Sequence, residues 1–112
     1  MLLQNKVILV TGAGRGVGRA IALEAAKAGA AVAVNDLGVG LDGSGHDAGP
    51  AQEVVKEIEA MGGRAIALTK SVASWKDAHE MIEETVAKLG GIDGLVNNAG
   101  NLRDVTVSER GV

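Results

Sequence analysis

The 112-residue sequence contains no cysteine, no phenylalanine and no tyrosine, and it has a single tryptophan and a single proline. Without cysteine, disulfides, thiolate zinc sites and cysteine nucleophiles are excluded. The core has to be built from aliphatic side chains, because only 1% of the residues are aromatic. No apolar stretch is long enough to span a bilayer, and no segment has the form of a signal peptide. These absences predict a soluble protein, and we expect it in the cytoplasm.

The charge balance is weakly acidic, with a formal net charge of -3. Because no run of basic residues is present, neither nucleic acid nor an anionic membrane is expected as a partner. The length allows one domain. His79 and Glu83 have i, i+4 spacing, but two ligands make a poor metal site and a solvated helix face is the preferred interpretation. His46 lies in a glycine-rich stretch and indicates no metal either.

Short apolar runs alternate with helical patterns along the chain. Strands are predicted at 6–10, 30–35, 65–68 and 92–96, and helices at 17–28, from Pro50 to about Gly62, and after a segment resembling a capping box at 74–77. Residues 37–49 are rich in Gly, Asp and Ser and are predicted to form a loop. Strands joined by crossover helices form a parallel sheet. The predicted fold is α/β, a Rossmann-type doubly wound parallel sheet with strand order 3-2-1-4.

Helical periodicity predicts which side chains each helix buries. The predicted buried faces are Val17, Ala20, Ile21, Ala25 and Ala28 in the first helix, Ala51, Val54, Val55 and Ile58 in the second, and Ala78, Met81, Ile82, Thr85, Val86 and Leu89 in the third. Trp75 is predicted to pack against the protein rather than to stack on a ligand. Residues 105–112 are predicted to begin a further helix.

The strongest functional signal is the segment TGAGRGVG at 11–18, between the first predicted strand and helix. Glycines let the backbone approach a pyrophosphate, and the helix N-terminus offers N–H groups and the positive end of its dipole. Val17 stands where the G-x-G-x-x-G fingerprint has its last glycine, so the spacing is G-x-x-x-G-x-G over Gly12, Gly16 and Gly18. No Gly-Lys-Ser/Thr follows, which excludes a P-loop. The alternative, an ordinary tight turn, is disfavoured by the order strand, loop, helix, strand and terminal acid.

That terminal acid is Asp36, 18 residues after Gly18, close to the separation expected for the acid that binds ribose hydroxyls. A carboxylate there accepts hydrogen bonds from the diol and repels a 2′-phosphate. The alternative interpretation is a turn residue at the end of a strand.

Together, 11–18 and Asn97-Asn98-Ala99-Gly100 resemble the T-G-x-x-x-G-x-G and N-N-A-G motifs of the short-chain dehydrogenase/reductase family, and the resemblance covers almost the whole chain. Within the family, 35–38 and 98–104 are similar to the hydroxyacyl-CoA dehydrogenase modules of multifunctional β-oxidation enzymes. The resemblance implies NAD or NADP as cofactor. The implied cofactor-binding residues are Gly12, Arg15, Gly16, Val17, Gly18, Asp36, Leu37, Ser71, Val72, Asn98, Ala99 and Gly100.

Two of these positions bear on which cofactor is bound. A basic residue at the position of Arg15 often accompanies NADP in the family, whereas Asp36 favours NAD. A fixed carboxylate facing a phosphate discriminates more strongly than a flexible arginine, so we predict NAD rather than NADP. Ser71 stands where the family usually has Asp before Val72, and its hydroxyl can still hydrogen-bond the adenine. A polar turn is the alternative interpretation of Asn97 and Asn98.

The family's catalytic groups are an Asn, a Ser and a Tyr-x-x-x-Lys pair, and the chain contains no tyrosine. By resemblance these positions lie beyond Val112, so 1–112 is predicted to be a partial dinucleotide-binding domain without catalytic residues or a metal. Its parent would transfer hydride between NAD and a hydroxy or keto substrate, with 3-hydroxyacyl-CoA as one candidate. The alternative is a non-catalytic nucleotide-binding or interaction module. A flavodoxin-like domain is less well supported, because the glycine loop followed by Asp36 suits a dinucleotide.

The last expectation concerns association. By resemblance the parent is a homo-oligomer. In the chain by itself, the strand at 92–96 would present an open, apolar, parallel edge with unpaired N–H and C=O groups. We therefore expect the isolated chain to be unstable, to self-associate, or to be ordered only beside the rest of the protein or a second copy.

Overall fold

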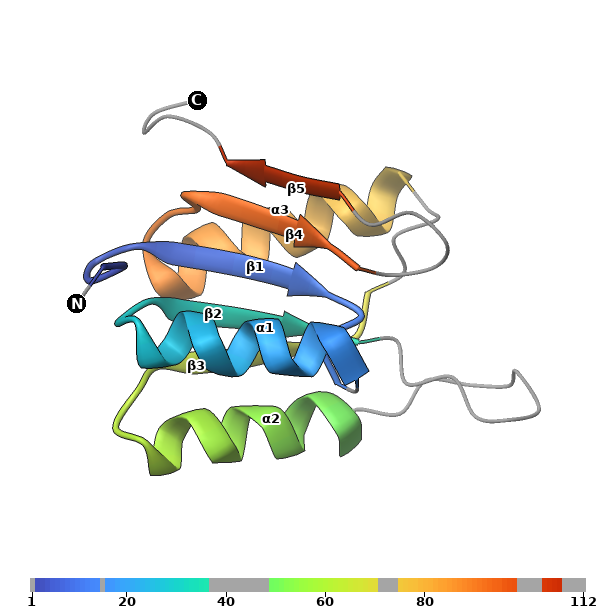
Figure 1. Ribbon diagram of the computed structural model, residues 1–112. Helices are drawn as coiled ribbons and strands as arrows, with labels where there is room; N and C mark the ends of the chain where they lie inside the picture. The colour runs from blue at the N-terminus through green and yellow to red at the C-terminus, as the bar shows by residue number, and fades with distance from the viewer. Residues whose placement is uncertain (1, 15, 37–48, 71–74, 99–103, 108–112) are drawn as a thin grey trace.

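The computed structural model describes residues 2–14, 16–36, 49–70, 75–98 and 104–107, the last range by its backbone alone. Within these ranges five strands and three helices form a sheet flanked by helices (Figure 1). In chain order they are β1 (Val7–Thr11), α1 (Gly16–Lys27), β2 (Ala31–Asn35), α2 (Gly49–Ala60), β3 (Ala65–Leu68), α3 (Trp75–Leu89), β4 (Gly94–Asn97) and β5 (Asp104–Val107).

The sheet has the order β3-β2-β1-β4-β5. The pairs β1–β2, β1–β4 and β2–β3 are parallel, which confirms the predicted order 3-2-1-4 for the first four strands. All four parallel strands point to the right in Figure 1, and the three helices begin at that same side. The carboxyl ends of the strands and the amino ends of the helices therefore share one edge of the molecule.

The core lies in two layers, one on each face of the sheet, because successive side chains of a strand point to opposite faces. Val10, Val32 and Val34 pack on one face with the buried side chains of α1 and α2. Leu9, on the opposite face, packs with Met81 of α3. Figure 1 shows the same division, with α1 and α2 in front of the sheet and α3 behind it.

The prediction of a helix beginning at 105 is wrong where the structure describes this region. Asp104–Val107 is a strand that pairs antiparallel with β4, with Val96 opposite Val105 and Asn97 opposite Asp104. The β-branched sequence Val-Thr-Val at 105–107 suits an extended backbone better than a helix. The sheet therefore continues past β4, and the expected open edge at β4 does not exist.

The predicted buried face of α2 is confirmed, since Ala51, Val54, Val55 and Ile58 are all buried. The predicted face of α1 is partly wrong. Val17 is 51% exposed and Ala20 is also exposed, whereas Gly18, Ala22 and Ala25 are buried. The close approach of Gly18 to the glycine loop, described below, turns this face of α1 inwards.

The predicted face of α3 is also partly wrong. Met81, Thr85 and Leu89 are buried, but Ile82 and Val86 are 39% and 43% exposed. Trp75 is 88% exposed, so the prediction that it packs against the protein is wrong among the described residues. One apolar edge of α3 thus remains on the surface of the described structure.

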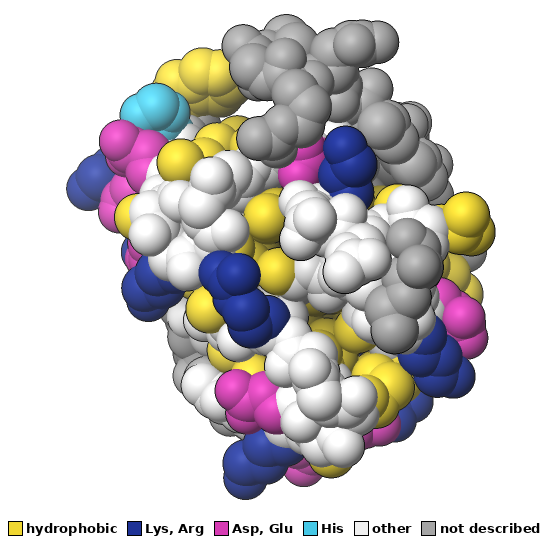
Figure 2. Space-filling view, turned by 90° about the vertical axis from the view of Figure 1, so that its left-hand side faces the viewer, with side chains coloured by type: hydrophobic (Ala, Val, Ile, Leu, Met, Phe, Trp, Pro, Cys, Tyr) yellow, Lys and Arg dark blue, Asp and Glu magenta, His cyan; other side chains and the backbone are white. Residues whose placement is uncertain are grey.

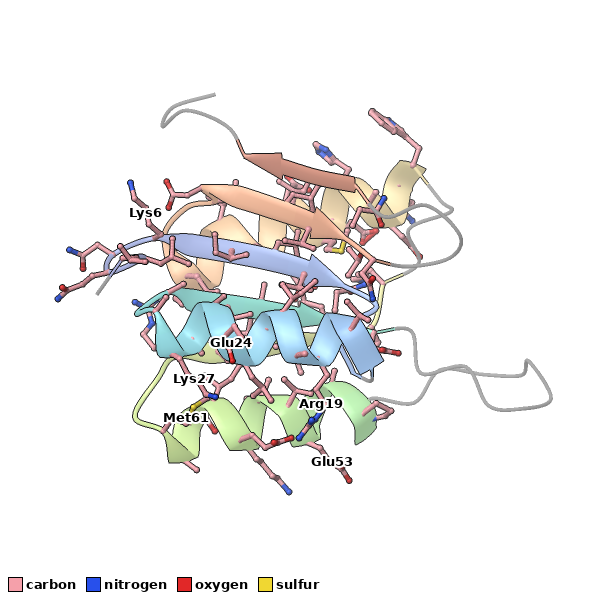
Figure 3. The ribbon with its side chains drawn as sticks, viewed as in Figure 1. Lys6, Arg19, Glu24, Lys27, Glu53 and Met61 are labelled. Carbon is pink, nitrogen blue, oxygen red and sulfur yellow. The ribbon has the colours of Figure 1, made fainter. Side chains whose placement is uncertain are left out.

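The amino ends of the strands lie at the opposite side of the molecule, which Figure 2 shows with hydrophobic side chains visible between charged ones. A hollow of about 470 Å³ opens there, and Lys6, Met61 and Arg64 contribute to its lining. In Figure 3, Lys6 and Met61 both lie on this side. Among the described residues, no helix combines the length and the apolar character needed to cross a bilayer.

Candidate functional site

The candidate site lies at the carboxyl ends of β1, β2 and β4. The register pairs Thr11 with Asn35 on one side and with Asn97 on the other, so three polar strand-end residues lie in a row. After β1 the chain continues to β2, which lies on one side of β1, whereas β4 lies on the other side of β1. This reversal of strand order is where open α/β sheets bind ligands.

The glycine loop turns sharply out of β1 and enters α1 at Gly16. Gly12 and Gly16 have φ values of 61° and 57°, which glycine adopts without steric cost. The backbone N–H of Ala13 donates to the carbonyl of Asn35 at 3.1 Å, which fixes the loop to the end of β2. The loop therefore has a defined position against two strands.

Gly18 brings α1 into close contact with this loop. A Cβ at position 18 would lie 2.1 Å from the Gly12 carbonyl oxygen and 2.8 Å from the Asn98 side-chain nitrogen. These distances leave no room for any side chain. The missing Cβ lets the amino end of α1 lie against the loop, which is the role expected of the last glycine in a phosphate-binding turn.

A hydrogen-bond network joins the ends of β1 and β4. The buried Thr11 hydroxyl donates to the Asn97 side-chain oxygen at 2.8 Å and accepts the Asn98 backbone N–H at 3.0 Å. The Asn98 side-chain N–H in turn donates to the Gly12 carbonyl at 3.5 Å. The two sequence motifs, 86 positions apart, are thus bonded to each other. Through this network Asn97 and Asn98 join the end of β4 to the end of β1 and to the glycine loop.

Asp36 follows β2 directly and faces the glycine loop. Its carboxylate oxygen Oδ2 accepts the Gly14 backbone N–H at 2.7 Å, and its own N–H donates to the Leu68 carbonyl at 3.0 Å. A short N–H···O⁻ bond of this kind is stronger than a neutral one. The acid predicted for ribose binding is therefore held beside the segment predicted for phosphate binding.

Asn35 is a site residue to which the sequence analysis assigned no role. Its side chain is 2% exposed and bonds Lys70 twice, donating to the carbonyl and accepting the backbone N–H, both at 3.0 Å. This pair of bonds joins the ends of β2 and β3. A buried asparagine at the end of an otherwise apolar strand was the available signal, because buried amides need partners.

The predicted site residues divide into three groups. Gly12, Gly18, Asp36 and Asn98 are brought together as described. Gly16 and Val17 form the exposed first turn of α1. The remaining predicted residues lie outside the described ranges: Arg15, Leu37, Ser71, Val72, Ala99 and Gly100.

Two described basic residues near the site, Arg19 and Lys70, are paired with carboxylates. The guanidinium of Arg19 binds both carboxylate oxygens of Glu57, and this ion pair joins α1 to α2. Figure 3 shows Arg19 extending from α1 towards α2. The ammonium of Lys70 lies 3.6 Å from Glu80 and 3.9 Å from Glu84, so its charge is directed to α3.

His79 and Glu83 form an exposed pair, with 3.5 Å between Nε2 and Oε1. Within the described part of the chain, no group of three or more His, Cys, Asp or Glu side chains could hold a metal ion. His46 lies outside that part.

Comparison with known proteins identifies the family. The family model for short chain dehydrogenases matches residues 6–110, and the chain belongs to this family. It is 48% identical over 103 residues to the peroxisomal multifunctional enzyme A of Dictyostelium discoideum, covering 92% of the chain and 23% of that protein. It is 50% identical to a short-chain type dehydrogenase/reductase of Mycobacterium tuberculosis, covering 92% of the chain and 36% of that protein.

Solved structures show the same relationship. A short chain dehydrogenase from Mycobacterium avium is 52% identical, with a TM-score of 0.81 over 93% of this chain and 37% of the other. A 7α-hydroxysteroid dehydrogenase complexed with NADH and 7-oxo glycochenodeoxycholic acid is 38% identical, with a TM-score of 0.79. The match covers 88% of this chain and 35% of that one. The chain thus has the fold of the family but spans well under half the length of these relatives.

Proposed function

We propose that this chain is the cofactor-binding part of a dehydrogenase and that it binds NAD in preference to NADP. The observation that carries the proposal is the 2.7 Å hydrogen bond from the Gly14 N–H to the Asp36 carboxylate. It holds a negative charge beside the glycine loop, where the adenosine ribose of a dinucleotide would lie if its pyrophosphate bound at the amino end of α1.

The residues fit this cofactor. Because Gly18 has no Cβ, the amino end of α1 packs against the Gly12 carbonyl, which places the N–H groups of the helix N-terminus beside the glycine loop, where a pyrophosphate would bind. The positive end of the α1 dipole favours the phosphate charges there. A carboxylate has about four lone-pair sites, so Asp36 can accept ribose hydroxyls as well as the Gly14 N–H. The same carboxylate would repel a 2′-phosphate, because like charges a few ångströms apart cost about 1 kcal/mol in water and more near a protein surface.

We further propose that the parent protein oxidises a hydroxy group or reduces a ketone. The nicotinamide ring supplies hydride acceptance and donation, and the hydroxyl proton passes to a base. This chain contains no tyrosine, so a tyrosine base would have to lie elsewhere in the parent. The resemblance of residues 35–38 and 98–104 to hydroxyacyl-CoA dehydrogenase modules favours a 3-hydroxyacyl-CoA substrate. Similarity to the hydroxysteroid dehydrogenase favours a different alcohol. The cytoplasmic location stays a prediction, as does a homo-oligomeric parent.

Calorimetric titration of the chain with NAD⁺ and NADP⁺ tests the cofactor preference. We expect NAD⁺ to bind at least about tenfold more tightly, a difference of ~1.4 kcal/mol. Asp36→Asn removes the negative charge and should lower the ratio of NAD⁺ affinity to NADP⁺ affinity. Glu59→Gln is the matched control, because it removes the same charge from an exposed position near the end of α2. Equal or tighter binding of NADP⁺ by the unmodified chain would contradict the proposal.

A non-catalytic nucleotide-binding module is the alternative. Both candidates bind the cofactor, so titration does not separate them. A coding sequence that continues beyond Val112 into a Tyr-x-x-x-Lys segment would support the dehydrogenase. Its absence from the full coding sequence would support the module.

A further inference from the structure

Gly14 lies where the glycine loop, the end of β2 and the start of α2 meet. A Cβ built on Gly14 would lie 2.6 Å from the Pro50 Cβ, 2.7 Å from Oδ2 of Asp36 and 2.9 Å from its Cγ. Outside its own residue and the two chain neighbours, a Cβ atom essentially never comes within 3.0 Å of another heavy atom. The carboxylate of Asp36 therefore occupies space that a side chain at position 14 would need.

Conformation is not the reason for a glycine here. The described glycines with positive φ are Gly12, Gly16, Gly29, Gly62 and Gly90. Gly14 is not among them, so the backbone at this position does not itself demand glycine. The requirement comes from the space around it.

We infer that Gly14 is a specificity-determining residue, because the absence of its side chain lets the Asp36 carboxylate take the position that selects between a ribose hydroxyl and a 2′-phosphate. The inference rests on the proposed function. It assigns the choice of cofactor to a contact between the loop and the acid rather than to the acid alone.

Gly14 determines the position of the Asp36 carboxylate in two ways. The Gly14 N–H holds Oδ2 by a hydrogen bond, and the bare Cα allows that oxygen to come close. A methyl group at position 14 would oppose this approach. The two crowded partners are the Pro50 ring at the start of α2 and the Asp36 carboxylate. The ring of Pro50 is rigid, whereas the Asp36 side chain can rotate about two bonds, so a methyl group at position 14 is expected to displace the carboxylate.

The consequence differs for the two cofactors. A displaced carboxylate no longer accepts the ribose hydroxyls of NAD, so NAD binds more weakly. A 2′-phosphate meets less repulsion, so NADP binding is kept or improved. Gly14→Ala should therefore lower the ratio of NAD to NADP affinity although it leaves Asp36 in the sequence.

A double-mutant cycle tests this coupling. The affinities for NAD⁺ and NADP⁺ are measured for the chain, Gly14→Ala, Asp36→Ala and the double variant. We expect Gly14→Ala to lower the NAD:NADP ratio about fivefold or more, and to have no further effect on the ratio once Asp36 is alanine. Gly63→Ala is the control, since its Cβ would be similarly crowded, 2.8 Å from the Ile58 Cγ2, at the far end of α2. It should leave the ratio unchanged.

The outcomes separate the inference from the proposed function. If the unmodified chain prefers NAD and Gly14→Ala keeps that preference, the inference is overturned and the proposed function stands. If the unmodified chain has no NAD preference, both are overturned.

A second measurement needs no folded Gly14 variant. In the ¹⁵N-labelled chain, Asp36→Asn should move the Gly14 amide resonance by more than Glu59→Gln does. An unchanged Gly14 resonance would overturn the inference by itself.

Discussion

Residues at the ends of adjacent strands align the site through side-chain amides. Asn35 bonds the backbone of Lys70 twice, and Asn97 and Asn98 bond around Thr11. Asp36 and the glycines could be predicted from the sequence, because their chemistry and spacing are local. The role of Asn35 could not, because its partner is 35 positions away and becomes a neighbour only when β2 and β3 pair.

We predict that Asn35→Ala destabilises the protein by about 1–3 kcal/mol, because it leaves the backbone N–H and C=O of Lys70 without the amide that now bonds both. Urea denaturation followed by circular dichroism measures the change. Gln52→Ala, at an exposed position of α2, is the control and should change stability by less than about 0.5 kcal/mol. A similarly small effect at Asn35 would show that water replaces the side chain without loss.

At the scale of the element, periodicity predicted the buried face of α2 in full and the buried faces of α1 and α3 only in part. All four predicted positions of α2 are buried. In α1 the contact of Gly18 with Gly12 determines which side faces the sheet, so Val17 points outwards. The hydrophobic pattern of a helix does not reveal such a contact, because glycine has no side chain and its partner lies in another element.

The orientation of α3 yields a prediction for two adjacent residues. Met81 is 4% exposed and packs in the layer behind the sheet, whereas Ile82 is 39% exposed. Met81→Ala should cost about 2–5 kcal/mol of stability by leaving a cavity. Ile82→Ala should cost under about 1 kcal/mol, because much of its side chain is already in water. Urea denaturation of the two variants measures the difference, and equal costs would contradict the described orientation of α3.

For the whole molecule, the alternation of strands and helices was enough to predict the order of the first four strands. The fifth strand was missed. It pairs antiparallel with β4, and the alternation of parallel strands with crossover helices does not predict an antiparallel strand. The β-branched residues at 105–107 were the local signal for it. Because β4 is paired on both sides, an open β4 edge can no longer be the reason for self-association.

The structure indicates a different surface through which self-association could occur. Trp75, Ile82 and Val86 are exposed on α3, and their spacing of seven and four residues places them along one side of the helix. Exposed apolar side chains that line up in this way favour contact with another apolar surface. We therefore predict that the isolated chain still associates with a second copy, through α3 and not through the sheet.

Trp75 provides the measurement, because it is the only tryptophan and no tyrosine is present. At 88% exposure it should emit as a solvated indole in dilute solution. As concentration rises, its emission should shift to the blue in step with the mass measured by light scattering, because association buries the ring. The double variant Ile82→Gln/Val86→Gln should suppress both changes and leave the fold intact, since both positions are partly in water and glutamine is a good helix former. Removal of residues 104–112 tests the sheet instead, because it unpairs one edge of β4. Association that persists in the glutamine variant while Trp75 emission stays constant would show that the copies meet elsewhere than on α3.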